Sequence, residues 1–146
     1  MAEPFVLFDL AGTPYALRSR DVRYIEMIEA ITPVPNAGPW VDGVVLSRGQ
    51  VVPVLSLRAR FGFPRAPHDL RTRLIVVDAD GRSVGLLVDR AREFITIASE
   101  AVQPPQESIT TLSGRYVEGI VTLGNRIVLV LQLAEILSAT PPAVPA

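Results

Sequence analysis

Two stretches of the chain, VDGVVLSRGQVVPVLSLRARF at residues 41–61 and VEGIVTLGNRIVLVLQLAEIL at residues 117–137, align with each other without a gap. Each stretch holds two short apolar runs around a turn, followed by a helical segment. The two stretches carry the same residue at Val41/Val117, Gly43/Gly119, Val45/Val121, Val52/Val128, Val54/Val130, Leu55/Leu131 and Leu57/Leu133. A pattern that recurs in this way predicts a duplicated structural unit.

The hairpins before these stretches correspond as well. The matching positions are Asp9/Asp78, Gly12/Gly81, Leu17/Leu86 and Arg23/Arg92. Turn residues predict four hairpins in all, which pair residues 5–10 with 15–17, 43–46 with 51–55, 74–77 with 84–88, and 117–123 with 127–131. The chain therefore reads as one unit of hairpin, strand, loop, hairpin and short helix, repeated twice.

Helix is expected to be a minor component. Short segments are predicted after Ser19, at 57–61, near 99–102 and at 132–138, with Ser19 and Ser56 at N-cap positions. Residues 5–8 and 127–130 are apolar on both faces, so both strands should lie between two cores. The predicted fold is mainly β, with two small barrels that share a core and fold as one body.

The composition excludes several kinds of chemistry. The 146 residues include no cysteine and one histidine, which excludes disulfides, thiolate catalysis, iron–sulfur clusters and cysteine zinc sites. His68 stands in a proline-flanked loop and is expected to be solvated. No phosphate-binding loop or nucleophile elbow is present. We therefore expect no metal and no cofactor.

Charge and hydropathy limit the partners. The net charge is −1 at pH 7, and no basic surface for a nucleic acid is expected. All 14 cationic residues are arginines, which suit pairing and recognition. The longest apolar run, residues 127–131, is far shorter than the roughly 20 residues that span a bilayer. Without membrane insertion or an export leader, the protein is expected in the cytoplasm.

Several blocks resemble the CheW family of chemotaxis coupling proteins. They are Pro35-Asn36-Ala37, residues 41–54, residues 57–62, residues 84–89, Pro104-Pro105, residues 116–119 and residues 123–126. Their order and spacing match the family from about residue 5 to residue 137. The resemblance implies two interleaved, SH3-like, five-stranded β-barrel subdomains in one domain, residues 1–139, with short helices and a C-terminal helix. Residues 140–146 hold three prolines and are expected to be disordered.

The resemblance also implies a function without an active site. Such proteins link the cytoplasmic tip of chemoreceptors to the regulatory domain of a CheA-type histidine kinase, within arrays at the inner membrane face. A groove between the barrels would accept a receptor helix by its apolar face. The kinase contact would be apolar and centred on hairpin strands. Self-association or ring assembly is a further expectation.

Site residues follow from the resemblance, position by position. Receptor binding falls on Val22, Gly43, Arg48 and Gly49, with Arg48 at a hairpin tip. Kinase binding falls on Tyr24, Gln103 and Ser108. Structural explanations stay open beside these roles, because Arg48 could be an ordinary exposed turn residue, Val22 a core residue, and the glycines conformational requirements.

Departures from the family pattern leave alternatives open. Ser47 replaces the usual asparagine, Ser56 the usual aspartate, and Tyr24 a frequent glutamate, while the loop at 103–108 lacks basic or large apolar residues. The chain could be a divergent accessory protein that binds receptors with weakened kinase coupling. Outside the family, an unrelated paired SH3-like module or a carboxylate enzyme remains. Three sets of residues are also undecided: Trp40 as core or lid, Arg58, Arg60 and Arg65 as solvated or partner-binding, and Asp78, Asp80 and Asp89 as an acidic cluster.

Overall fold

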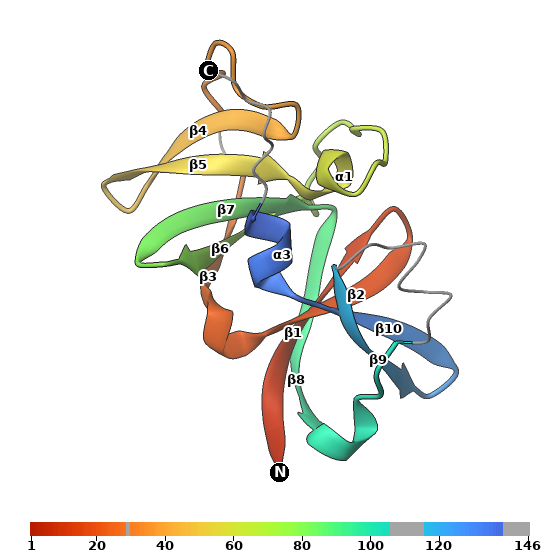
Figure 1. The fold of residues 1–146 in the computed structure, drawn as a ribbon. Coiled ribbons are helices and arrows are strands. Elements are labelled where there is room, and N and C mark those ends of the chain that lie inside the picture. Colours follow the sequence, from red (N-terminus) through yellow and green to blue (C-terminus); the bar gives the residue numbers. More distant parts are fainter. Residues whose placement is uncertain (29, 106–115, 139–146) are drawn as a thin grey trace.

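The computed structural model describes residues 1–28, 30–105 and 116–138, and these form two five-stranded sheets (Figure 1). The elements in chain order are β1 (Ala2–Leu10), β2 (Thr13–Arg18), η1 (Ser19–Asp21), β3 (Val22–Met27), β4 (Val41–Ser47), β5 (Gln50–Ser56), α1 (Leu57–Arg60), β6 (Arg73–Ala79), β7 (Arg82–Val88), β8 (Arg90–Ala98), η2 (Ser99–Ala101), β9 (Val117–Leu123), β10 (Arg126–Leu131) and α3 (Leu133–Leu137). The predicted hairpins and short helical segments are confirmed.

The two repeats exchange their first hairpins. One sheet has the order β8-β1-β2-β10-β9 and the other β3-β6-β7-β5-β4. We call them, with the side chains they enclose, the β1 barrel and the β6 barrel. The β1–β2 hairpin of the first repeat therefore lies among strands of the second, and the β6–β7 hairpin lies among strands of the first. Each exchange is made through a parallel pair, β2 with β10 and β7 with β5.

The two aligned stretches, residues 41–61 and 117–137, occupy equivalent places in the two sheets. Both hairpins, β4–β5 and β9–β10, shift register at the same point, between Val41 and Gly43 in one and beside Leu131 in the other. Each also receives one isolated bridge from the preceding loop, Thr32 to Val44 and Gln103 to Ile120. The duplication is therefore present in the backbone pairing itself.

The exchange explains why β1 is apolar on both faces. Phe5 and Leu7 point into the β1 barrel, whereas Val6 and Phe8 enter a core shared by the two barrels. The same alternation was expected of residues 127–130, and it is wrong at Ile127, which is 60% exposed. Ile127 is the second residue after the Gly124-Asn125 turn, where β10 has not yet reached the barrel core.

Local signals decide the helix ends. The Ser56 hydroxyl accepts a hydrogen bond of 3.1 Å from the Ala59 amide, so Ser56 is the N-cap of α1, as predicted. The N-cap prediction for Ser19 is wrong, because Ser19 is itself the first residue of η1 and Arg18 precedes it without a side-chain cap. No helix in the described ranges is long and apolar enough to cross a membrane. The tail at 140–146 lies outside the described residues.

Candidate functional site

Arg48 stands at the tip of the β4–β5 hairpin. Arg48 and Gly49 form a two-residue turn with φ angles of +51° and +80°, closed by the Ser47–Gln50 pair. The Arg48 side chain is exposed, and its guanidinium carbon lies 3.6 Å from the centre of the Tyr24 ring. Among the residues that the structure describes, Arg48 forms no ion pair. The turn therefore displays a cation that no acidic side chain of the described chain neutralises.

Tyr24 connects this turn to β3. Its hydroxyl lies 2.6 Å from the Ser47 Oγ, and Ser47 is only 3% exposed. Because β3 and β4 are the two edge strands of the β6 barrel, this hydrogen bond joins the edges of the sheet. The structure thus brings Tyr24, expected at the kinase contact, together with Arg48, expected at the receptor contact.

The other expected receptor residues differ in accessibility. Gly43 is buried with a φ of +140°, and a Cβ there would lie 2.1 Å from the Thr32 carbonyl oxygen. Gly49 is exposed with open space around it. Val22 is half-buried against the shared core. Gly43 therefore has a structural requirement for glycine, whereas Arg48 and Gly49 are open to a partner.

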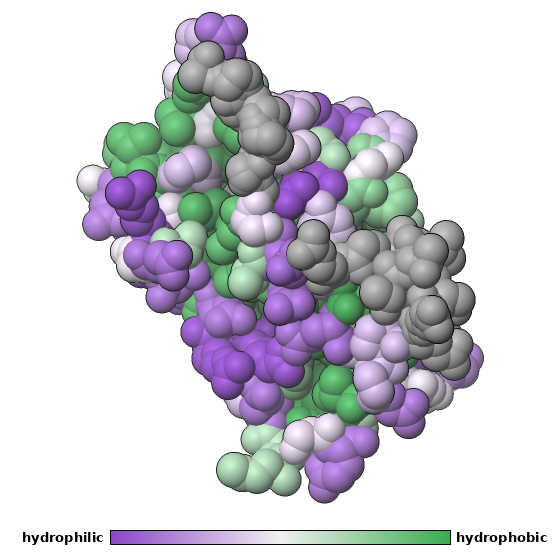
Figure 2. Space-filling model, viewed as in Figure 1, coloured by the Kyte–Doolittle hydropathy of each residue, from purple (hydrophilic) through white to green (hydrophobic). Residues whose placement is uncertain are grey.

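A groove of about 540 Å³ lies between the barrels, next to η1. Figure 2 shows hydrophilic side chains gathered near the middle of the molecule, between the two barrels. The groove is lined by Arg18, Arg20, Asp21, Asp78, Asp80, Glu118 and the α3 residues Leu133 and Leu137, among others. Half of the residues in this lining are charged, so the groove differs from the apolar helix groove that the sequence analysis expected.

The expected kinase residues do not form one cluster. Tyr24 belongs to the β6 barrel, whereas Gln103 lies beside β9 of the β1 barrel, where its backbone exchanges hydrogen bonds of 2.9 and 2.8 Å with Ile120. Ser108 lies outside the described residues. The described part of the chain therefore places the two remaining residues on different barrels.

Two exposed apolar side chains flank the Arg48 turn. Leu46 is 71% and Val51 68% exposed, and they face each other across β4 and β5. Figure 2 shows hydrophobic side chains at this upper-left end of the molecule, over the β4–β5 hairpin. Sequence reasoning missed this pair, because both residues sit inside continuous valine-rich runs that predict buried strands. Leu46 and Val51 lie next to the Ser47–Gln50 pair that closes the turn. Their position so close to a hairpin tip was the signal that could have indicated exposure.

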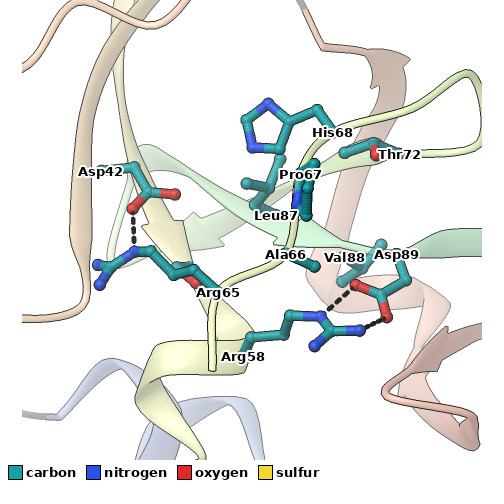
Figure 3. Close-up of a pocket in the computed structure, with 11 residues that line it drawn as sticks. Asp42, Arg58, Arg65, Ala66, Pro67, His68, Thr72, Leu87, Val88 and Asp89 are labelled. Carbon is teal, nitrogen blue, oxygen red and sulfur yellow. Dashed lines mark hydrogen bonds and ion pairs between the residues drawn. The ribbon is translucent and has the colours of Figure 1, made fainter. Parts of the chain in front are cut away.

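A small cavity of about 50 Å³ lies beside two ion pairs. Figure 3 shows the residues that line it. Arg58 binds the Asp89 carboxylate with two hydrogen bonds of 2.8 and 2.7 Å, and Arg65 binds Asp42 at 2.8 Å. Burial alone would raise the pKa of Asp89, but the Arg58 guanidinium and the Ala11 amide together hold that pKa below its ordinary value. Arg58 and Arg65 are therefore already paired with carboxylates of the same chain.

The remaining undecided residues also have internal roles. Arg60 donates to the Ile136 and Glu135 carbonyls and lies 4.6 Å from the Trp40 ring, which packs half-buried on the shared core. The Asp78 Oδ1 accepts the Gly81 amide at 2.8 Å, an ordinary turn contact. His68 is exposed. Over the described ranges, no group of histidine or carboxylate side chains could hold a metal ion.

Comparison with known proteins places the chain in one family. A family model described as "CheW-like domain" matches residues 4–140. The chain is 27% identical to the chemotaxis protein CheW of Klebsiella aerogenes, over 95% of this chain and 84% of that protein. It is 30% identical to the chemotaxis protein CheW of Bacillus subtilis, over 92% and 86%.

The fold agrees with this assignment. The crystal structure of the scaffolding protein TtCheW from Thermoanaerobacter tengcongensis matches with a TM-score of 0.87 and 29% identity, covering 96% of this chain and 95% of that one. The expected pair of SH3-like barrels is confirmed by this likeness. Because the domain match spans nearly the whole chain, the chain belongs to the CheW family of non-enzymatic chemotaxis scaffolds, which couple chemoreceptors to a CheA-type histidine kinase.

Proposed function

We propose that this scaffold uses the β4–β5 hairpin for both partners, with Arg48 and Gly49 at the turn binding the receptor tip and the apolar outer face of the hairpin binding the kinase regulatory domain. The observation that carries the proposal is the Arg48 guanidinium, exposed at a hairpin tip and stacked on an aromatic ring. In contrast, Arg58 and Arg65 are held by carboxylates of the same chain.

The receptor contact suits a charged hydrogen bond. Receptor tips of the kind that the family binds are helical, and their surfaces offer carboxylates and carbonyl oxygens. A guanidinium has five N–H donors in one plane, which can bind a carboxylate through two bonds at once. Gly49, with no side chain beside this cation, leaves room for the partner's backbone. Gly43 supports the site from within the β6 barrel rather than by contact, whereas Val22 lies half-buried against the shared core.

The kinase contact suits the apolar pair Leu46 and Val51. Interface cores are depleted of charge and rich in large apolar groups, and exposed neighbours of this kind mark such surfaces. Ile127 is the repeat counterpart of Val51 and is also exposed, on the far hairpin β9–β10. The chain thus provides its own matched control for a change at the β4–β5 face.

The test is a set of calorimetric titrations against a receptor-tip fragment and, separately, against the kinase regulatory domain. Arg48→Ala should weaken receptor binding by about 10- to 100-fold, the equivalent of one charged hydrogen bond, and leave kinase binding within about twofold. Val51→Ser should weaken kinase binding, whereas Ile127→Ser should not. Equal losses for both partners in Arg48→Ala, or unchanged receptor binding, would contradict the proposal.

The divergent-accessory alternative has a distinct outcome in the same titrations. A protein that had lost kinase coupling would bind the receptor fragment in an Arg48-dependent way and show no heat with the kinase domain. Cytoplasmic location at receptor arrays is part of the proposal, since the receptor tip lies there. Self-association or ring assembly stays a prediction, which sedimentation over a range of concentrations would check.

A further inference from the structure

The Tyr24 ring lies directly beneath the Arg48 guanidinium. We propose that Tyr24 is a positioning residue, which presents Arg48 to the receptor with all of its N–H donors free. This inference rests on the receptor-binding role proposed for Arg48. It assigns Tyr24 to the receptor surface, although the family resemblance placed that residue at the kinase contact.

The distance between the two groups defines the geometry of the contact. The Arg48 guanidinium carbon is 3.6 Å from the Tyr24 ring centre, compared with 4.6, 5.0 and 5.5 Å in the other three arginine–aromatic contacts of the described chain. A separation of about 3.5–4.0 Å is van der Waals contact between carbons. An N–H group pointing straight into the ring would need more space, so this distance indicates that the face of the guanidinium lies over the face of the ring.

Stacking and an ion pair engage different parts of the guanidinium group. Stacking uses the face of the guanidinium, whereas hydrogen bonds to a carboxylate use the N–H groups in its plane. Arg48 is therefore restrained in orientation but keeps its donors and its charge. A carboxylate at position 24, as is frequent in the family, would instead hold Arg48 through some of those donors.

The Tyr24 ring is itself held in place from two sides. Tyr24 packs half-buried on the apolar interior of the β6 barrel, and its hydroxyl is hydrogen-bonded to the buried Ser47 Oγ at 2.6 Å. Ser47 and Tyr24 are two of the positions at which this chain departs from the family pattern, and the structure shows that they contact each other. Together they form a fixed support for the residue that follows Ser47 in the turn.

The experiment compares Tyr24→Phe, Tyr24→Leu and Tyr24→Glu, each with Arg48 and with Arg48→Ala. Tyr24→Phe keeps the ring and should bind the receptor-tip fragment within about twofold of the original protein. Tyr24→Leu should weaken binding by about two- to fivefold, as expected for loss of an exposed cation–π contact. Tyr24→Glu installs the residue that is frequent in the family at this position and replaces the stack with an ion pair, so its loss should be no larger than that of Tyr24→Leu. In the Arg48→Ala background, none of the three should cause a further loss.

A second measurement needs no partner. In the free protein, the ring current of Tyr24 should shift the Arg48 Nε–H proton upfield in an NMR spectrum, and this shift should persist in Tyr24→Phe and vanish in Tyr24→Leu. Thermal midpoints and kinase binding report any general damage to the fold. The positioning role alone would be overturned if Tyr24→Leu weakened receptor binding equally with Arg48 and with Arg48→Ala. Absence of the upfield shift would also overturn it. Unchanged receptor binding by Arg48→Ala would overturn the proposed function, while the NMR shift would still report the stack.

Discussion

Arg23 on β3 donates a hydrogen bond of 2.9 Å to Asp78 on β6. The other sheet contains the equivalent pair, in which Arg92 on β8 donates to Asp9 on β1 at 3.0 Å. In both cases the arginine belongs to one repeat and the aspartate to the other. The hairpin exchange therefore converts two repeated residues into two ion pairs, each of which ties one repeat to the other.

The two equivalent ion pairs should differ in their contribution to stability. Asp9 is less exposed than Asp78, and its Oδ1 is buried without a hydrogen-bond partner. Arg92→Ala would leave that carboxylate uncompensated and should lower the free energy of unfolding by about 1–3 kcal/mol. Arg23→Ala removes a more exposed pair and should cost less than about 1 kcal/mol. Urea unfolding of the two variants checks this order, and a larger loss for Arg23→Ala would contradict it.

Val54 and Val130 should be energetically equivalent. They occupy matching positions in the two repeats, and both are 0% exposed, as the sequence alignment predicted. Truncation of either to alanine should lower the free energy of unfolding by about 1–3 kcal/mol through lost burial and a residual cavity. Val51→Ala, on the exposed side of the same hairpin, is the control and should stay within about 0.5 kcal/mol. Denaturant midpoints that do not move for either core variant would refute the equivalence.

Gly43 and Gly49 should respond differently to alanine. At Gly43 the new Cβ would overlap the Thr32 carbonyl and sit at a φ of +140°, so Gly43→Ala should destabilise the protein by more than about 2 kcal/mol. At Gly49 nothing lies within 4 Å, and only the positive φ opposes the change, at about 1–2 kcal/mol. Thermal unfolding distinguishes them. Receptor-binding losses in Gly43 variants should therefore accompany loss of stability, and a stable Gly43→Ala protein would disprove the close approach.

The Asp89–Arg58 pair should make stability depend on pH. Since the pKa of Asp89 is lowered in the folded protein, its contribution is complete above the ordinary aspartate pKa of about 4 and is lost as the pH falls through the lower folded value. Asp89→Asn should therefore cost about 1.5–3 kcal/mol at pH 7 and progressively less below about pH 4. Asp80→Asn, the same change at an exposed turn, is the control. Urea unfolding from pH 7 to pH 2 measures the difference, which should not stay constant.

Much of the local structure could be predicted because its causes are local. The turns Ala11-Gly12, Arg48-Gly49 and Asp80-Gly81 all adopt the positive φ angles that a two-residue hairpin turn requires. Ser56 caps the helix that it directly precedes. The repeat was visible because equivalent positions need the same residue types. Family membership, which the same residues indicated, excludes the unrelated module and the carboxylate enzyme.

The errors arose where a residue's surroundings come from distant parts of the chain. Ile127 reads as a core residue in a valine-rich strand, but the barrel ends before it. Arg58 and Arg65 read as free cations, because their partners Asp89 and Asp42 are far away in sequence. Composition could not distinguish such paired arginines from the exposed Arg48.

By itself, the sequence determined which segments are hairpins, that the unit occurs twice, and to which family the chain belongs, since turn conformation and strand periodicity depend on neighbouring residues. Only the tertiary structure decided that the repeats exchange hairpins, which depends on packing of strands tens of residues apart. It alone placed the Tyr24 ring against Arg48, because that contact needs the two edge strands of one curled sheet, β3 and β4, to approach each other. The positions of Tyr24 and Arg48 in the sequence do not reveal that the two edge strands approach each other, and the candidate site depends on this approach.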